Sequence, residues 1–264
     1  MSRYPEPMLT ALTVPDALRG FVDGIWTHTG NGRPHRVLPD GCLDFIFNLE
    51  RGTATLVGPM TRAILVPVPA GMTSFGVRFR PGCAARFIDA HASELCDDQT
   101  ALVDVTRVAS LAERIADAPN HAARTEAVTR ALLESRARTR GRDRLVERGV
   151  ALIARTRGAA SVSALAAELG LSERQLERRF LERVGLGPKR LARIVRFEHA
   201  LELARQSPAS QAEIAARAGY SDEPHLVREV RALSGLSFQA LRRERAAEPA
   251  QDVGFVQGER HRSR

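Results

Sequence analysis

Two similar stretches decide the fold of this chain. Residues 161–185 read SVSALAAELGLSERQLERRFLERVG, and residues 210–235 read SQAEIAARAGYSDEPHLVREVRALSG. Each contains a short apolar segment with helical periodicity, a break at a glycine, and a second helical segment rich in charged side chains. The repeat predicts one small helical unit that is present twice in the C-terminal part of the chain.

The break in each stretch has the chemistry of a tight turn between two helices. A glycine follows the last periodic position of the first helix, Gly170 in the first unit, where a left-handed residue is needed and only glycine adopts it without strain. Ser172 is expected to cap the next helix, and Gln175 completes a capping box. Ser210 and Glu213 repeat this spacing in the second unit. Helix, turn and helix form the helix-turn-helix arrangement, which presents its second helix to the DNA major groove.

The second helix of the first unit has both a core face and a reading face. Leu176 and Phe180 are four residues apart and are expected to pack inward. Arg, Gln and Glu occupy the rest of its circumference, and these side chains pair with guanine, adenine and cytosine edges respectively. A solvated surface is the alternative for any single charged helix. Two such helices, each after a turn and a cap, favour DNA.

The second unit also resembles the signature of the AraC-type transcription regulators, whose C-terminal module joins two helix-turn-helix units by a long helix. Residues 219–230 read GYSDEPHLVREV and residues 235–237 read GLS, and the family pattern is close to GYSDxSHFxRxFxxxxGxSP. The first unit matches at Leu176, Arg178, Phe180, Gly185 and Pro188. The resemblance covers about a hundred residues and implies a sequence-specific DNA-binding regulator.

The second unit departs from this pattern at several positions. Pro224 replaces a small polar residue; a first helical turn tolerates proline, but proline cannot donate a hydrogen bond to DNA. Leu226 and Val230 replace aromatic core residues, Val227 replaces a polar residue, and Phe238 stands where proline is usual. We therefore expect the second unit to bind DNA less specifically than the first.

The candidate DNA-binding residues divide into base readers and phosphate contacts. The expected base readers are Arg174, Glu177 and Arg178 in the first unit, and Arg228 with His225 or Glu223 in the second. By analogy and charge, the expected phosphate contacts, which position the protein without specifying sequence, are Ser172, Arg179, Ser221 and Arg231. Gln175 completes the candidate set. We expect no catalytic residue, no metal ligand and no cofactor.

The distribution of charge agrees with this assignment. The chain has 264 residues and a formal net charge of +8. Residues 1–140 hold 16 basic against 15 acidic side chains, whereas residues 141–264 hold 23 against 16. A basic composition also fits a ribosomal or membrane-surface protein, but the excess of basic side chains lies in the half that contains the two units. No run of about 18 apolar residues and no signal-peptide pattern is present, so we expect a cytoplasmic protein.

The N-terminal half has the sequence pattern of short strands separated by turns. Segments with β-branched and aromatic residues, separated by Gly and Pro breaks, lie at 42–48, 53–57, 63–68 and 74–79. They predict a small antiparallel sandwich or barrel, and residues 15–18 are expected to start a short helix before it. The segment LPDGCLDFIFNL, with GVRFRPG downstream, resembles the cupin-like or related β-rich sensor domain of some AraC-type regulators.

Possible ligands for a metal form only a loose cluster in this half: His28, His35, Asp40, Cys42 and Asp44. No metal-site spacing joins them, so a metal site is disfavoured. Asp40 and Gly41 are predicted to form a hairpin turn, and Cys42 to be a small buried hydrophobe. A redox-sensing Cys42 beside Arg36 is the alternative. The three cysteines lack a CxxC spacing, which argues against a zinc site and a disulfide framework.

We expect an α+β chain with two domains and a tail. Residues 1–140 form the β-rich sensor or dimerisation domain with trailing helices, residues 141–245 form the all-α DNA-binding domain with units at 161–183 and 210–233, and residues 246–264 form a disordered tail. The Arg-rich stretch 135–144 is the expected joint.

Further helices are expected around these units. Amphipathic periodicity at 105–115 and 122–133 predicts helices that face either their own sheet or a partner subunit. A helix at 145–153 should lie beneath the first unit. A helix at 188–204 should hold the reading helices about one DNA turn, roughly 34 Å, apart.

The predicted function is a sequence-specific DNA-binding transcription regulator, modulated by a small-molecule effector bound to the N-terminal domain. Its expected partners are double-stranded promoter or operator DNA, the effector, RNA polymerase and a second copy of the chain, without a membrane partner. A nonspecific architectural DNA-binding protein is the first alternative, and it would bind scrambled DNA equally well. The second alternative is a metal- or thiol-dependent enzyme with a DNA-binding module; our prediction is that the chain is not an enzyme.

Overall fold

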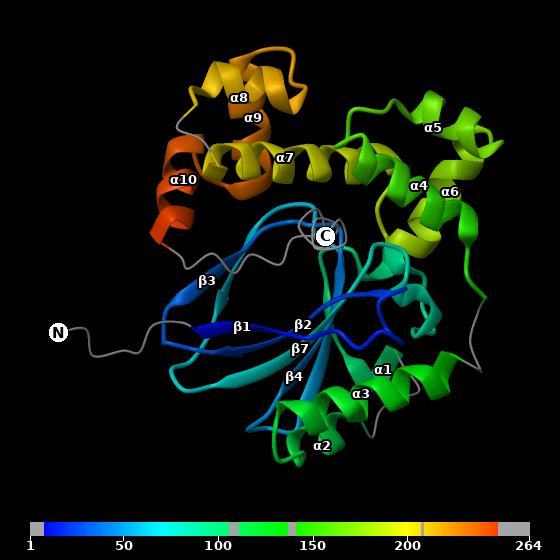
Figure 1. Ribbon diagram of the computed structural model, residues 1–264, viewed down its shortest axis with the longest axis vertical. Helices are drawn as coiled ribbons and strands as arrows, with labels where there is room; N and C mark the ends of the chain where they lie inside the picture. The colour runs from blue at the N-terminus through cyan, green and yellow to red at the C-terminus, as the bar shows by residue number, and fades with distance from the viewer. Residues whose placement is uncertain (1–7, 106–110, 137–140, 207–208, 248–264) are drawn as a thin grey trace.

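The computed structural model describes residues 8–105, 111–136, 141–206 and 209–247 (Figure 1). The N-terminal half is built on antiparallel β-sheet and the C-terminal part is helical, which confirms the predicted α+β class. Parts of three predicted segments lie outside the described residues: 106–110 of the helix at 105–115, 137–140 of the Arg-rich joint, and 248–264 of the tail.

A six-stranded antiparallel sheet is the framework of the N-terminal half. Its spatial order is β1 (Met8–Leu12), β2 (Val22–Thr29), β7 (Thr73–Phe79), β4 (Leu43–Asn48), β5 (Thr53–Val57) and β8 (Gln99–Ala101). A separate antiparallel ribbon pairs β3 (Pro34–Val37) with β6 (Ile64–Pro67). The helices of this half are η1 (Ala84–Arg86), η2 (Ala92–Leu95), α1 (Leu102–Val105), α2 (Leu111–Ala116) and α3 (His121–Arg136).

One face of the six-stranded sheet carries the core of this half. Ile25, Val77 and Phe45 lie side by side across β2, β7 and β4, and all three are fully buried. Side chains alternate between the two faces of a strand, so these apolar residues share one face. Helices α2 and α3 cover it with buried residues that include Ile115 and Val128 (Figure 1). Of the two orientations expected for these helices, the structure therefore shows packing onto their own sheet.

The opposite face of the sheet is filled by Trp26. A Cβ atom added to Gly76 would lie 2.0 Å from the indole Cε2 atom, so the indole ring rests directly on the bare backbone of β7. His28 lies on the same face and approaches His35 of the β3–β6 ribbon, with 6.0 Å between ring centroids. The ribbon thus covers this face, and an aromatic side chain occupies the space beneath it.

Two local predictions for this half are wrong. Residues 15–18 form a turn that buries Leu18 in the core and leads into β2, rather than the start of a helix. Asp40 and Gly41 do form a turn, in which Asp40 Oδ1 accepts from the Cys42 N–H at 2.9 Å. However, that turn connects β3 to β4, which belong to different sheets, so it does not close a hairpin.

The C-terminal part consists of helices packed around one long helix. Its described elements are α4 (Arg144–Arg155), α5 (Val162–Leu169), α6 (Glu173–Val184), α7 (Pro188–Gln206), α8 (Gln211–Ala218), α9 (Glu223–Ser234) and α10 (Phe238–Ala247). The pair α5 and α6 lies near one end of α7, and the pair α8 and α9 lies near the other (Figure 1). Helix α10 extends two residues into the stretch that was expected to be a disordered tail. No helix of the described ranges is long and apolar enough to cross a membrane.

The predicted helix boundaries of both units are present. Ser172 and Gln175 form a complete capping box, and so do Ser210 and Glu213. Gly170 ends α5 in the left-handed conformation, with φ of 66°. These caps satisfy backbone groups that a helix end would otherwise leave without partners. Local interactions therefore specify the turn of the first unit and the start of the second.

The residues that depart from the family pattern fit the helical core. Leu226 and Val230, which replace aromatic residues, are fully buried, and Phe238 is 2% exposed. Leu176 and Phe180 of the first unit are likewise fully buried, as their spacing predicted. The two units therefore share a continuous apolar core along α7.

Candidate nucleic-acid interface

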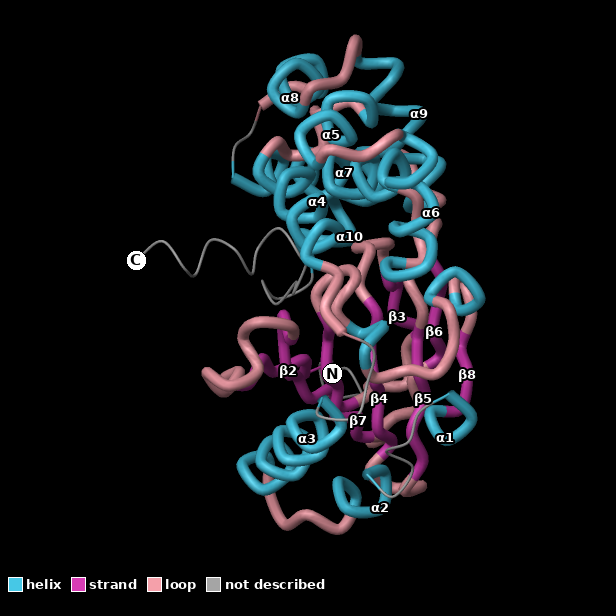
Figure 2. The backbone as a smooth tube through the Cα atoms, turned by 90° about the vertical axis from the view of Figure 1, so that its right-hand side faces the viewer, coloured by secondary structure: helices cyan, strands magenta, loops and turns pink. Residues whose placement is uncertain are grey.

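The two candidate recognition helices, α6 and α9, lie on the same side of α7 (Figure 2). Helix α7 has 19 residues and is therefore about 28 Å long. This length is close to one turn of B-DNA, roughly 34 Å. The arrangement allows both helices to face one side of a DNA duplex.

Helix α6 exposes two arginines one helical turn apart. Arg174 and Arg178 are both exposed, and the structure gives neither guanidinium a hydrogen bond or an ion pair with another described residue. Residues at positions i and i+4 lie on the same face of a helix. Both guanidiniums can therefore reach one segment of a major groove.

Ser172 and Gln175 are exposed but already occupied by the helix cap. Gln175 Oε1 accepts from the Ser172 N–H at 2.9 Å and from its hydroxyl at 3.0 Å. Reading of adenine by glutamine uses both the amide oxygen and the amide nitrogen. Gln175 can therefore offer DNA its N–H donors while the cap is intact, but a two-bond contact would require the cap to open.

Arg179 and Glu177 are directed toward neighbouring elements of the protein. Arg179 Nη1 donates to Asp143 Oδ2 at 2.7 Å, and Asp143 also caps α4. The Glu177 carboxylate lies over Gly187 at the start of α7, where an added Cβ atom would be 2.2 Å from Glu177 Oε1. Of the residues predicted to read bases or bind phosphate on α6, these two have structural neighbours that compete with DNA.

A hydrogen-bonded group stands at the start of α9. Asp222 caps the helix by accepting from the His225 N–H at 2.6 Å, and this bond is the main reason that the pKa of Asp222 is lowered. The Ser221 hydroxyl donates to Asp222 Oδ2 at 3.1 Å and lies 3.0 Å from His225 Nδ1. With the serine proton directed to Asp222, the serine oxygen accepts from Nδ1–H, which leaves His225 Nε2 as an acceptor for a ligand.

Helix α9 also carries exposed charged side chains. Glu223, Arg228 and Arg231 are exposed, as a role in DNA binding requires. Glu229 faces inward and accepts two bonds from Arg193 of α7, at 2.9 and 2.8 Å. Sequence reasoning missed this pair, because no spacing rule connects residues 36 positions apart.

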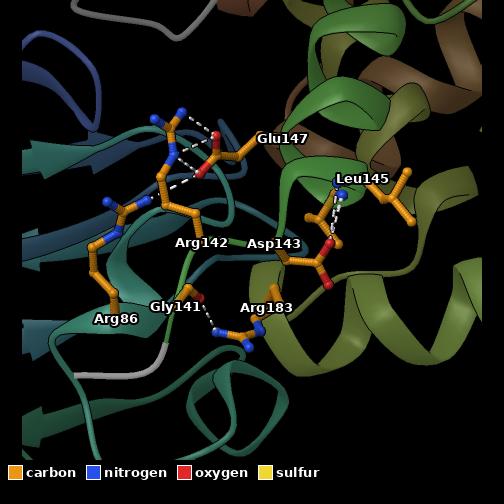
Figure 3. A network of polar contacts seen from close by, with 8 residues as sticks. Arg86, Gly141, Arg142, Asp143, Leu145, Glu147 and Arg183 are labelled. Carbon is orange, nitrogen blue, oxygen red and sulfur yellow. Dashed lines mark hydrogen bonds and ion pairs between the residues drawn. The ribbon is translucent and has the colours of Figure 1, made fainter.

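The N-terminal half is bonded through a buried arginine to α4, which packs against the first unit. The Arg86 guanidinium lies against the rings of Phe21 and Phe87, at 5.4 and 6.0 Å from their centroids. Arg86 Nη2 donates to Glu147 Oε1 of α4 at 3.0 Å, and Arg142 Nε donates to the same carboxylate (Figure 3). Sequence analysis did not single out any of these three charged residues.

The N-terminal half also contacts the second unit. Arg36 of β3 donates to Glu244 Oε1 of α10 at 2.8 Å and to the Ser234 carbonyl at 3.1 Å. The Ala63 N–H donates to the Leu233 carbonyl of α9 at 2.7 Å. The β-rich half is therefore bonded both to α4, beside the first unit, and to the second unit.

The loose cluster of possible metal ligands is largely an ion-pair network. Arg78 binds Asp40 at 3.1 Å and Asp44 at 2.9 Å. Cys42 is buried against the helical core, as predicted, and burial together with Asp40 raises the pKa of its thiol well above the usual value. That environment opposes the redox-sensing alternative, because the reactive form of cysteine is the thiolate. No group of three or more His, Cys, Asp or Glu residues in the described ranges is arranged to hold a metal ion.

Comparisons with known families agree with this division of the chain. Residues 165–244 match a family described as a helix-turn-helix domain, and residues 13–101 match a domain of unknown function, DUF6597. No curated protein matches the chain significantly. The C-terminal part of the chain therefore contains a helix-turn-helix domain, and the N-terminal half contains a separate domain.

The chain also matches several solved structures at low sequence identity. The C-terminal domain of AraT, a response regulator from Geobacillus stearothermophilus, is 24% identical over 41% of this chain and 91% of its own, with a TM-score of 0.37. CdpR from Pseudomonas aeruginosa is 20% identical over 67% of this chain and 47% of its own, with a TM-score of 0.33. ToxT from Vibrio cholerae, bound to an unsaturated fatty acid, is 9% identical over 92% of this chain and 97% of its own, with a TM-score of 0.43.

Proposed function

We propose that the chain is a transcription regulator of the AraC type, which reads operator DNA by placing α6 and α9 in successive segments of the major groove. The observation that carries the proposal is the pair of exposed guanidiniums of Arg174 and Arg178, one turn apart on α6. A guanidinium forms two bonds with the O6 and N7 atoms of guanine, which is the commonest specific contact between protein and DNA.

The other candidate residues take different parts in the proposal. In the second unit, Arg228 with His225 or Glu223 would read bases. Ser172 of the first unit, together with Ser221 and Arg231 of the second, would contact phosphates. Arg179, Glu177 and Gln175 would support the helices that present these side chains, because each already has a neighbour within the protein.

The proposal extends to the whole chain. Residues 1–140 would sense a small-molecule effector, residues 141–245 would bind promoter or operator DNA, and the protein would act in the cytoplasm without catalysing a reaction. A homodimer would have to use surfaces other than the core-facing sides of α2 and α3, which are buried on the sheet. Contact with RNA polymerase would accompany activation.

Fluorescence anisotropy of the full chain on its own upstream intergenic DNA tests the proposal. We expect binding to the cognate site to exceed binding to scrambled DNA by roughly a thousandfold or more, and to weaken as salt increases. Equal affinity for both DNAs, with the same dependence on salt, would contradict sequence-specific reading and favour a nonspecific architectural protein.

A further inference from the structure

A cleft opens where the segment between β5 and β6, residues 58–63, meets α7 and α9. Its volume is about 260 Å³, and it is lined by Thr61, Arg62, Arg190, Arg193, Ala232 and Leu233. Three of these six residues are arginines and none is acidic. The cleft therefore presents cationic side chains from both halves of the chain.

The three guanidiniums differ in how far their charge is balanced. Arg193 is neutralised by its two bonds to Glu229. Arg190 is exposed and contacts Cys96, whose thiol stays protonated because burial raises its pKa. Arg62 is exposed, and the structure gives it no ion pair with another described residue. Two of these guanidiniums, one from each half, thus have no ion pair with another described residue.

A carboxylate is bonded to the rim of the cleft. Asp97 accepts from both the N–H and the hydroxyl of Thr61, each at 2.6 Å. Those two bonds fix the segment that carries Arg62. The backbone at this edge of the cleft is therefore held in place, which reduces the ordering cost when a ligand binds.

We infer that the cleft binds a small oxyanion with two negative charges, such as a dicarboxylate or a phosphate. Guanidinium groups bind carboxylate and phosphate oxygens through paired, charge-assisted hydrogen bonds. Arg62 would hold one side of the anion and Arg190 the other. The inference rests on the proposed function, because the anion would be the effector of the regulator.

The position of the cleft gives the anion a way to act on DNA binding. The neighbouring bond from the Ala63 N–H to the Leu233 carbonyl joins the β-rich half to α9. Arg62 and Arg190 carry like charges on the two sides of the seam between the halves. An anion that binds only when both are in place stabilises the docked arrangement by mass action. Helix α9 carries the base readers of the second unit, so ligand binding is linked to their placement.

Isothermal titration calorimetry of the full chain tests the inference. Inorganic phosphate and succinate are titrated separately at constant ionic strength, against the unchanged protein, Arg62→Ala and Arg51→Ala. Arg51 is an exposed arginine in the turn between β4 and β5 and provides the same loss of charge away from the cleft. We expect saturable binding of at least one anion by the unchanged protein and by Arg51→Ala, and roughly tenfold or greater weakening for Arg62→Ala. The preferred anion distinguishes a phosphate ligand from a dicarboxylate.

Two results would overturn the inference: no saturable binding of either anion at millimolar concentration, or equal binding by Arg62→Ala and the unchanged protein. Anisotropy on operator and scrambled DNA, with the same preparations and no added anion, separates this failure from failure of the proposed function. Specific operator binding without anion binding leaves the function intact. If Arg62→Ala binds both anions as tightly as the control but loses affinity for both DNAs, Arg62 contacts the DNA backbone and the inference is wrong.

Discussion

Arg174 and Arg178 differ from the other charged residues of α6 in one respect: each has an exposed guanidinium with no competing partner in the described part of the chain. Arg179 is adjacent in sequence and chemically identical, yet it is paired with Asp143. The difference arises from the helical turn of about 100° per residue, which directs consecutive side chains to different surroundings. Accessibility therefore separates a base reader from a structural arginine at this helix.

We expect Arg178→Ala to weaken operator binding by about 1–3 kcal/mol and to relax preference at one base pair. The physical reason is the loss of two directed bonds to a single base, while the phosphate contacts remain. Anisotropy on a panel of operators with single base-pair changes measures both effects. Arg243→Ala, which removes an exposed charge from α10, is the matched control. Uniform weakening on every DNA by Arg178→Ala would assign this side chain to the backbone instead.

The sequence divided the candidates into base readers and phosphate contacts by analogy and charge, without the partners that each side chain has in the fold. The spacing of Leu176 and Phe180 identified the buried face of α6, which leaves every other position as a possible reader. Sorting requires partners that are distant in sequence, such as Asp143 for Arg179. Gln175 was predicted both as a cap and as a DNA contact, and only the geometry shows that the cap uses its acceptor.

At the scale of helices and strands, local chemistry predicted where helices begin and end but did not predict which strands pair. Caps and left-handed glycines act within a few residues, so the starts of α6 and α8 were readable from the sequence. Strand partners are a property of the whole sheet. β3 pairs with β6, joining residues about 30 positions apart, and the turn at 40–41 resembles a hairpin although its strands separate. The strand β2 was missed because its burial comes from neighbours on both sides.

The two glycines that end α5 and α6 should respond differently to alanine. Gly170 has φ of 66° and open space where a Cβ atom would be added, so Gly170→Ala should cost about 1 kcal/mol from backbone strain alone. Gly185 has φ of 84°, and an added Cβ atom would lie 2.5 Å from the Ala92 carbonyl oxygen of η2. Gly185→Ala should therefore cost roughly 2–4 kcal/mol, because overpacking adds to strain. Urea unfolding of both variants measures the difference, and equal losses would show that α6 does not press on η2 in solution.

At the scale of the whole molecule, the β-rich half is bonded to α4, beside the first unit, and to the second unit. Glu147 is the central acceptor at α4, and the Arg86 side chain that it binds is only 7% exposed. Glu147→Gln removes a carboxylate charge that faces the buried Arg86 guanidinium and should cost more than about 1 kcal/mol. Glu168→Gln makes the same chemical change in an exposed pair with Arg148 and should cost less than about 1 kcal/mol. Thermal unfolding of the two variants compares them, and similar losses would mean that the seam contributes little to stability.

The seam between the halves also contains a carboxylic acid that ought to make stability depend on pH. Glu198 of α7 has a buried Oε2 atom without a hydrogen-bond partner in the described structure. Burial and the nearby carboxylates of Asp40 and Asp23 raise the pKa of Glu198 well above its ordinary 4.5, against the opposing effects of Arg78 and Arg245. These residues come together only where the two halves of the chain meet, so no local pattern in the sequence could indicate the raised pKa of Glu198.

Because the pKa of Glu198 is higher in the folded chain, the folded state keeps a proton that the unfolded state releases as pH rises above about 4.5. Glu198 therefore lowers stability progressively between that pH and its folded-state pKa. Glu198→Gln keeps the shape and removes the titration, so we expect it to be more stable than the unchanged protein by roughly 1 kcal/mol at pH 8 and by less at pH 5. Thermal unfolding across this pH range measures the difference in stability between the two proteins. The other titrating groups contribute equally to both proteins and largely cancel in this difference. A gap that stays constant with pH would show that Glu198 is solvated and ionised throughout, and that the two halves do not close over it as the structure describes.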